Sequence, residues 1–370
     1  MRIRRAALPI LLLPLFTAAC RSDPAFVAAS PAPSPVSPSP SSVSSSPSLP
    51  SSFSLSPSPS PVTTTYLPKP GNPGGKAVVP AAARAVDTSR PSRTVGDGTP
   101  SSCTSAAVVR AVAAGGVITF DCGPAPVTIT MKATAKAGTS VVLDGGNRVT
   151  LSGAGKRRIL AMESTGDTPR LTIQNMAFTR GFSSSSDGGG AVFARGGRLK
   201  VVNSRFTGNG CARTGPDLGG GAIRVLDQPD RPVYVVGSTF TGGTCSNGAA
   251  LSSIGVSWTI LNSRFTDNEA VGHGANPAKS GTPGGGSGGA IYLDGNAFTL
   301  TLDGTLIEDN TAAEGGGAVF FVSNDRTGTL KIRNSELRHN ESQGFETPGY
   351  PGIFYLGAGT PQISGSRLAD

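Results

Sequence analysis

One position of an internal repeat collects side chains that are able to perform acid–base chemistry. The residue before the last asparagine of the repeat is Asp267, Asp309 and His339 in three successive copies. If equivalent positions lie about 5 Å apart, as in neighbouring β-strands, two carboxylates there raise the pKa of one of them, which suits acid–base catalysis. Such a separation is also close to that of a retaining glycosidase pair. We therefore take these three residues as candidate catalytic groups; the alternative is a solvated turn, where polar side chains are common.

A second candidate is a row of large side chains at the end of a recurring Gly-Gly-Ala-Ile motif. Alternate residues of a strand face opposite sides, so these side chains share one face. An arginine is not expected to lie unpaired in a core, so Arg224 indicates that this face lies outside the core. Exposed aromatic rings in a row suit stacking on sugar rings. The alternatives are that the two faces are reversed or that neighbouring loops cover the row. The candidate binding stripe consists of Phe193, Arg224, Leu251, Tyr292, Phe320 and Phe354.

The sequence contains no clear motif for other kinds of functional site. His273 lies in a Gly-His-Gly triplet that resembles one signature of polygalacturonases, but the companion motifs of that family are missing, and we treat the triplet as chance. The chain has two histidines, no metal-ligand spacing and no glycine-rich phosphate loop, so we predict no metal and no cofactor. The net charge of +9 includes Arg2, Arg4 and Arg5 of the expected signal peptide. The remaining charges are scattered, which argues against a nucleic-acid partner and leaves weak attraction to anionic cell-surface polymers.

These candidates are positioned by a repeat that fills the second half of the chain. Copies begin at residues 171, 199, 233, 258, 300 and 330, and a truncated copy, PQISGSRL, follows. The motif GGAVF at residue 189 returns in related forms between the copies. One column of the repeat is always bulky and apolar: Phe178, Phe206, Phe240, Phe265, Ile307, Leu337 and Leu368. Another column is always asparagine or glycine: Asn175, Asn203, Gly237, Asn262, Gly304, Asn334 and Gly365.

Each copy is too short to bury its own apolar face, so successive copies must stack. A copy holds three short alternating runs divided by glycine or asparagine, which predicts three parallel strands per coil. We therefore predict an all-β fold, a parallel β-helix of about nine coils, right-handed because parallel crossovers strongly prefer that hand. The apolar column forms a ladder inside it, and the Asn/Gly column forms a turn. A short helix over residues 104–115, with Thr104 as N-cap, is expected to cap its N-terminal end.

The cysteines fit this architecture. Cys211 and Cys245 occupy the same column of consecutive copies, where stacking places them about 4.8 Å apart, within the usual Cα separation of a disulfide. We predict that they bond to each other. Cys103 and Cys122 are then left to pair and to tie the capping helix to the first coil, a closure worth roughly 3 kcal/mol.

The N-terminal part of the chain indicates export. Residues 1–19 have arginines, an apolar run and small residues, as in a secretory signal peptide. The stretch that ends at Cys20 resembles the lipobox of bacterial lipoproteins, which implies lipidation of Cys20, although Thr17 stands where leucine is usual. A free thiol after ordinary cleavage is the alternative. Residues 20–101 are rich in proline and serine and read as a disordered tether. The β-helix domain is expected over residues 102–370, outside the cytoplasm, held to the membrane by the lipid alone.

The Gly-Gly-Ala-Ile and Asn-Ser-x-Phe-x-x-Asn motifs resemble the repeats of polymorphic outer-membrane proteins, and the wider resemblance is to the pectin-lyase fold. This resemblance implies a right-handed β-helix, with a substrate groove along one sheet, and it leaves function open because the fold serves enzymes, tailspikes and adhesins. The motifs of the known enzymes are missing. We therefore expect a surface module that binds a polysaccharide or another surface partner along its exposed sheet. The alternatives are a polysaccharide lyase or glycoside hydrolase, and a structural spacer without a ligand.

Overall fold

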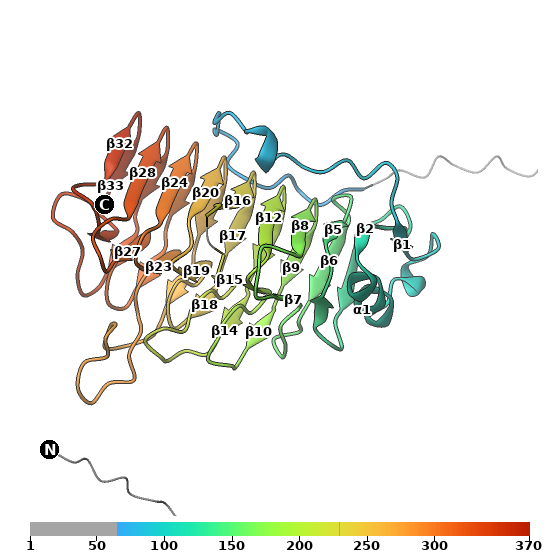
Figure 1. Cartoon of the computed structure of the whole chain (residues 1–370), viewed down its shortest axis with the longest axis horizontal. Coiled ribbons are helices and arrows are strands. Elements are labelled where there is room, and N and C mark those ends of the chain that lie inside the picture. The colour runs from blue at the N-terminus through green and yellow to red at the C-terminus, as the bar shows by residue number, and fades with distance from the viewer. Residues whose placement is uncertain (1–64, 229) are drawn as a thin grey trace, which may run out of the picture. The chain divides into compact units, whose positions relative to one another are not determined.

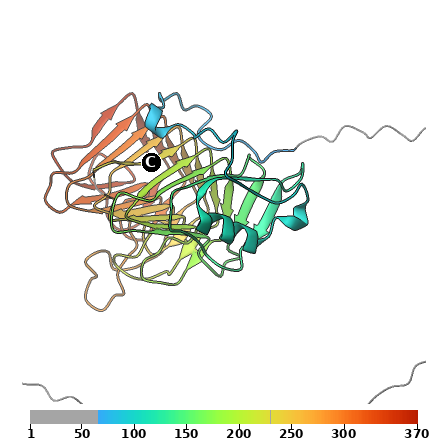
Figure 2. The same cartoon turned by 45° about the vertical axis from the view of Figure 1, so that its right-hand side comes forward.

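The computed structural model describes residues 65–228 and 230–370 (Figure 1). The expected signal peptide, the lipidation of Cys20 and the tether up to residue 64 lie outside the described residues. Within them, the chain is almost entirely β-structure, every strand pairing in the named sheets is parallel, and the arrangement is consistent with a parallel β-helix. Figure 2 shows the strands of successive repeats stacked one behind another along the body.

The strands form four sheets, each of which takes one strand from successive repeats. Sheet A has the order β1 (Arg93–Val95), β2 (Gly116–Phe120), β5 (Val141–Asp144), β8 (Arg170–Gln174), β12 (Arg198–Val202), β16 (Val233–Val236), β20 (Trp258–Leu261), β24 (Thr299–Asp303), β28 (Thr329–Arg333) and β32 (Gln362–Ser364). Sheet B has the order β3 (Val127–Thr130), β6 (Val149–Ser152), β9 (Ala177–Thr179), β13 (Arg205–Thr207), β17 (Thr239–Thr241), β21 (Arg264–Thr266), β25 (Leu306–Glu308), β29 (Glu336–Arg338) and β33 (Arg367–Ala369).

The other two sheets complete each repeat. Sheet C has the order β4 (Ala135–Ala137), β7 (Leu160–Glu163), β11 (Val192–Arg195), β15 (Ile223–Leu226), β19 (Leu251–Ile254), β23 (Ile291–Gly295), β27 (Val319–Ser323) and β31 (Ile353–Leu356). Sheet D is made of two-residue strands in the order β10 (Phe182–Ser183), β14 (Gly210–Cys211), β18 (Thr244–Cys245), β22 (Glu269–Ala270), β26 (Thr311–Ala312) and β30 (Glu341–Ser342). The short fourth sheet was not expected from the sequence, which predicted three strands per repeat.

The predicted apolar ladder is confirmed. The rings of Phe178, Phe206, Phe240 and Phe265 stack inside sheet B with centroids 4.8–5.0 Å apart. Parallel pairing in register continues the column through Ile307, Leu337 and Leu368. These side chains belong to one core that also receives the inward residues of sheets A and C. The ladder therefore holds consecutive repeats together by burying the same column in each.

The turn between sheets A and B explains the asparagine and glycine column. Asn175, Asn203 and Asn262 have φ angles of 52°, 46° and 50°, and Gly237 has 54°. This left-handed conformation is costly for most side chains, whereas glycine and asparagine tolerate it. A second asparagine column is buried inside the repeat. There the Asn310 amide donates to Asn340 Oδ1 at 2.8 Å, as the amide of Asn268 does to Asn310 Oδ1.

Helix α1 (Ser105–Ala114) lies at the N-terminal end of the stack, as predicted (Figure 1). Thr104 caps it by accepting a hydrogen bond from the Ala107 amide at 3.2 Å. The helix ends at Gly115, whose φ of 72° is outside the helical region. Its buried face carries Val108 and Val112 into the core, so it covers apolar residues that would otherwise face water.

Both predicted disulfides are present. Cys103 and Cys122 have Cα atoms 5.7 Å apart, and Cys211 and Cys245 have Cα atoms 4.7 Å apart. The second bond joins β14 to β18 in neighbouring repeats. Disulfides form in oxidising compartments, so both bonds indicate an environment outside the cytoplasm. Among the described residues, no helix is long and apolar enough to cross a membrane.

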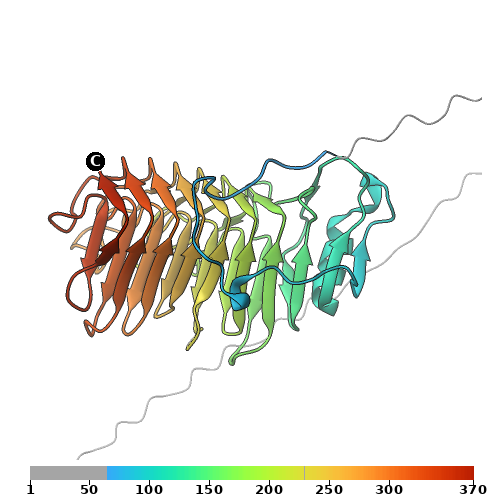
Figure 3. The same ribbon diagram turned by 90° about the horizontal axis from the view of Figure 1, so that it is seen from above.

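The expected boundary between tether and domain at residue 101 has to be moved. Strand β1 pairs with β2 and opens sheet A, and residues 65–92, here called the strap, lie along the outside of the body (Figure 3). The strap contains the 3-10 helix η1 (Ala81–Ala83), and a second, η2 (Pro100–Ser102), precedes α1. Asparagine and glutamine side chains on the body bind the strap backbone. The Pro-rich composition of this segment does not reveal its docking, because individual side chains of the body hold it.

Candidate functional site

The candidate binding stripe lies on the outer face of sheet C, with one correction. Strand pairing aligns Phe193 with Arg224, and continues to Tyr292, Phe320 and Phe354. The position in β19 that belongs to this column is Ser252, because Leu251 pairs with Ile223 and Ile291 and faces the core. Leu251 is therefore removed from the stripe.

The expectation that the stripe is exposed is wrong. Phe193, Arg224, Tyr292 and Phe320 are all buried. Loops fold over the outside of sheet C and supply the cover. The Arg158 guanidinium lies 4.7 Å from the Phe193 ring centroid, and the Phe345 ring meets Phe354 edge-on at 4.8 Å. The rings therefore stack on one another and on loop residues, and they present no open platform for a sugar.

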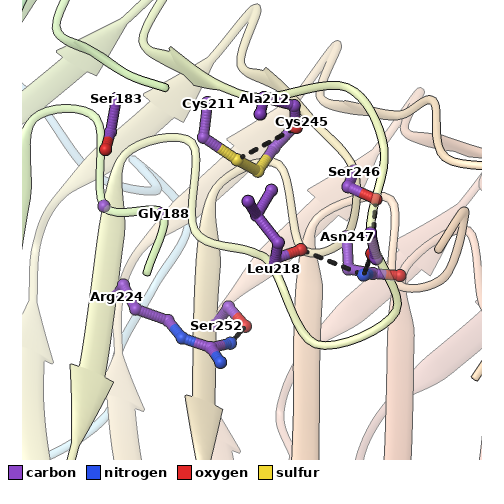
Figure 4. The surroundings of a disulfide bond; sticks show 12 residues. Ser183, Gly188, Cys211, Ala212, Leu218, Arg224, Cys245, Ser246, Asn247 and Ser252 are labelled. Carbon is purple, nitrogen blue, oxygen red and sulfur yellow. Dashed lines mark hydrogen bonds between the residues drawn. A yellow bond between two sulfur atoms is a disulfide. The ribbon is translucent and has the colours of Figure 1, made fainter. Parts of the chain in front are cut away.

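Arg224 lies in this covered region, next to Ser252 (Figure 4). Its side chain is 3% exposed and donates to Ser252 Oγ and to the Asp217 carbonyl, while its Nε has no partner. Burial lowers the pKa of the guanidinium, although nearby carboxylates oppose that shift. The Cys211–Cys245 disulfide is drawn in the same close-up and ties neighbouring repeats together there.

The glycine-rich insert of residues 268–288, which precedes β23, forms part of the cover. The Asn276 amide donates to the Tyr292 hydroxyl and to Asp217 at 2.8 Å, and to Asp294 at 3.2 Å. Burial raises the pKa of both Tyr292 and Asp294. This network satisfies polar groups that lie beneath the loops. The stripe is therefore a structural element.

His273 lies in the same insert and helps to hold it in place. Its Nδ1 lies 3.1 Å from Glu314, which also accepts hydrogen bonds from Lys279 Nζ at 2.8 Å and the Gly274 amide at 2.7 Å. Burial alone would raise the pKa of Glu314, but these hydrogen bonds and the Lys279 charge outweigh it and hold the pKa below its usual range. The buried carboxylate therefore anchors the base of the insert.

The candidate catalytic column is aligned but exposed to solvent. Asp267, Asp309 and His339 occupy left-handed turn positions with φ of 56°, 55° and 51°. Asp309 Oδ1 lies 3.3 Å from His339 Nδ1, and these side chains are 50% and 61% exposed. Asp267 instead accepts a hydrogen bond from Thr266. The exposure favours the solvated-turn alternative, because water screens interactions between such groups. Among the described residues, no group of three or more His, Cys, Asp or Glu is placed to hold a metal ion.

A groove that sequence reasoning missed lies on the outer face of sheet A. It has a volume of about 580 Å³ and crosses five neighbouring strands, β2, β5, β8, β12 and β16. Five strands span about 20 Å across the sheet. The floor is one outward column in continuous register: Val117, Val142, Thr172, Lys200 and Tyr234. Its size is within the range of ligand-binding clefts.

The groove is rich in positive charge. It is lined by Arg170, Arg198, Lys200 and Arg231, with Asp167 as its acidic residue. Asp167 is bound to Arg198 at 2.7 Å. The exposed side chains of Arg170 and Arg231 form no ion pair with a described residue, so their charge is available to a ligand. We call this site, with its floor and its basic residues, the cationic groove.

The strap forms one wall of the cationic groove through Ala82 and Val86. Lys200 reaches from the floor to this wall, where its Nζ donates to the Arg84 carbonyl at 2.7 Å. Burial beneath the strap lowers the pKa of Lys200. Ala83 packs against an apolar cluster on the outside of sheet A, made of Val202, Val236 and Leu261. The wall is thus held by both polar and apolar contacts.

A signal for the groove was present in the sequence. The strands of sheet A alternate as those of sheet C do, and their outward column includes Lys200 and Tyr234 in adjacent repeats. The inward and outward alternation of side chains along the strands does not show which sheet the loops leave uncovered. The strap and the loops around Asp167 and Arg231 rise on either side of sheet A, whereas loops close over sheet C.

Comparison with known protein families, with characterised proteins and with solved structures finds no match for this chain. The resemblance to polymorphic outer-membrane proteins and to the pectin-lyase fold therefore stays an expectation from the motifs.

Proposed function

We propose that this chain is an exported, lipid-anchored protein whose right-handed parallel β-helix binds an acidic polysaccharide in the cationic groove. The observation that supports this most is an open channel across five strands whose charged lining residues are basic except for Asp167. A polymer can lie across the strands along such a channel. Its carboxylate or sulfate groups would meet the arginines, and a sugar ring would stack on Tyr234.

The position of the groove fits the expected sheet-binding mode, but on a different sheet. The stripe of sheet C is covered, whereas Tyr234 and Lys200 on sheet A are only half-buried. An aromatic ring beside cationic groups suits a ligand that has both apolar sugar faces and negative charge. The disulfides support placement outside the cytoplasm, where such polymers occur.

The test compares retention of the secreted protein on an acidic polysaccharide, polygalacturonate, with retention on neutral dextran, and records new sugar ends. Retention on polygalacturonate that weakens as salt rises, without new sugar ends, is the expected result. Equal retention on both polymers, or none, would overturn the proposal. Release of sugar ends would make the protein an enzyme and return attention to Asp309 and His339.

A further inference from the structure

A second, smaller cavity lies where the strap first meets the body. It has a volume of about 310 Å³ and is lined by Tyr66, Leu67, Lys69, Pro70, Asn147 and Asn203. The strap supplies the aromatic ring and the lysine, and turns of the body supply the two amides. No carboxylate lines this cavity, which is separate from the cationic groove because the two share no lining residue.

Tyr66 is unusual among the aromatic residues of the described chain. Its side chain is 60% exposed, whereas the rings of sheets B and C are packed. The backbone beside the ring is held against the body. The Leu67 amide donates to the Asn147 carbonyl at 2.7 Å, and the Arg148 guanidinium carbon lies 5.9 Å from the ring centroid. Arg148 is itself tied to the Gly123 carbonyl.

An exposed ring on a backbone that is already held loses less conformational entropy when a ligand stacks on it than a ring on a free segment does. The polar groups around it also remain available. The Asn147 side chain forms no hydrogen bond with a described residue, and Asn203 donates only a long bond of 3.4 Å to Asn175. Lys69 is exposed and forms no ion pair with a described residue. One aromatic face, two amides and one ammonium thus converge on a cavity the size of a small ligand site.

We propose that this cavity binds a single acidic sugar unit, whose ring stacks on Tyr66 and whose carboxylate faces Lys69. The sugar hydroxyls bond to the amides of Asn147 and Asn203, which can both donate and accept. The Arg148 guanidinium adds positive charge near the ring. The site takes a uronic acid in preference to a neutral hexose, because its charged residues are all basic.

Saturation-transfer NMR of the secreted protein with galacturonic acid, and separately with galactose, tests the site. We expect transfer to galacturonic acid that is lost in Tyr66→Ala, retained in Tyr66→Phe, and at least several-fold weaker in Lys69→Ala. Galactose should show a much weaker signal. Val78→Ala is the matched control, since Val78 is also an exposed strap side chain, and it should behave as the wild type does.

Three results would overturn the proposal: no transfer in the wild type, transfer that persists in Tyr66→Ala, or equal transfer to the two sugars. Tyr66 is exposed, so its loss should leave the melting temperature unchanged, and melting curves verify this. The Tyr234→Ala variant separates this site from the cationic groove. That variant should keep the monosaccharide signal that depends on Tyr66, whatever it does to polymer binding.

Discussion

Gln174 binds both backbone groups of Val86. Its Oε1 accepts from the Val86 amide and its Nε2 donates to the Val86 carbonyl, each at 2.9 Å. Gln174 is buried at the end of β8, and its amide also donates to Asp144 at 2.8 Å. Asn262 repeats this pattern with Ala77, at 2.8 and 2.9 Å. These two amide clamps fix the strap as a wall of the cationic groove.

The Gln174→Ala variant should loosen the strap without unfolding the body. Each lost hydrogen bond is worth about 1 kcal/mol, so amide exchange over residues 79–88 should speed up by roughly tenfold or more. Hydrogen exchange followed by mass spectrometry measures this directly. Gln343→Ala is the control, because Gln343 is exposed on the body. Unchanged exchange in Gln174→Ala would show that the clamp does not hold the strap.

The Phe240→Ala variant should destabilise the body strongly. Phe240 is fully buried between Phe206 and Phe265, and its removal leaves a cavity in a continuous ladder. Such a truncation costs about 3–5 kcal/mol, which a denaturant titration resolves. The control is Phe182→Ala, at a partly exposed ring in sheet D. A cost below about 1 kcal/mol for Phe240→Ala would contradict the role of the ladder.

Glu308 should make stability depend on pH. It is buried between two arginines, 2.7 Å from Arg264 Nη2 and 2.6 Å from Arg338 Nη2. Burial alone raises the pKa of the carboxyl, but the hydrogen bonds and charges of Arg338 and Arg264 prevail and lower it. A pKa that is lower in the folded state stabilises the fold above the ordinary glutamate pKa of about 4.3. That contribution disappears as the pH falls through this value and below it.

The Glu308→Gln variant should therefore be less stable than the wild type at neutral pH, and the gap should narrow in acid. Thermal melting at several pH values between about 7 and about 3 measures the gap. The exposed Glu269, changed to glutamine, serves as the control. If the difference in melting temperature between the wild type and Glu308→Gln stays constant over this range, the ion pairs with Arg264 and Arg338 add no pH-dependent stability.

The sequence predicted those parts of the structure that repeat. The column of Phe206 and Phe240, the turn column of Asn203, and the pairing of Cys211 with Cys245 all follow from one periodic pattern. Periodicity failed where one copy is degenerate. The repeat pattern aligns Asn247 of the segment Asn247-Gly-Ala-Ala-Leu251 with the first glycine of the motif, whereas the strand pairing is shifted by one residue. A shift of one residue moves a side chain to the opposite face of the sheet, and Leu251 therefore faces the core.

The candidate site was harder to predict, because loops and the strap decide which face of a sheet stays open. The alternation places Arg224 outside the core correctly, but the outer face of a sheet is exposed only where no loop covers it. Asn276 and Phe345 come from irregular segments whose path no periodic pattern reveals. The docking of the strap depends on individual side chains such as Gln174, which look unremarkable in the sequence. The open groove on sheet A appears only when these segments are placed.

The most direct test of the cationic groove measures affinity for an acidic oligosaccharide of galacturonic acid by titration calorimetry. The protein is compared with the double variant Arg170→Ala/Arg231→Ala. The control is Arg110→Ala/Arg213→Ala, which removes the same charge from exposed positions outside the groove. We predict that the groove variant loses about tenfold in affinity and that the control does not. Equal affinities of the two double variants would contradict the assignment of the groove as the binding site.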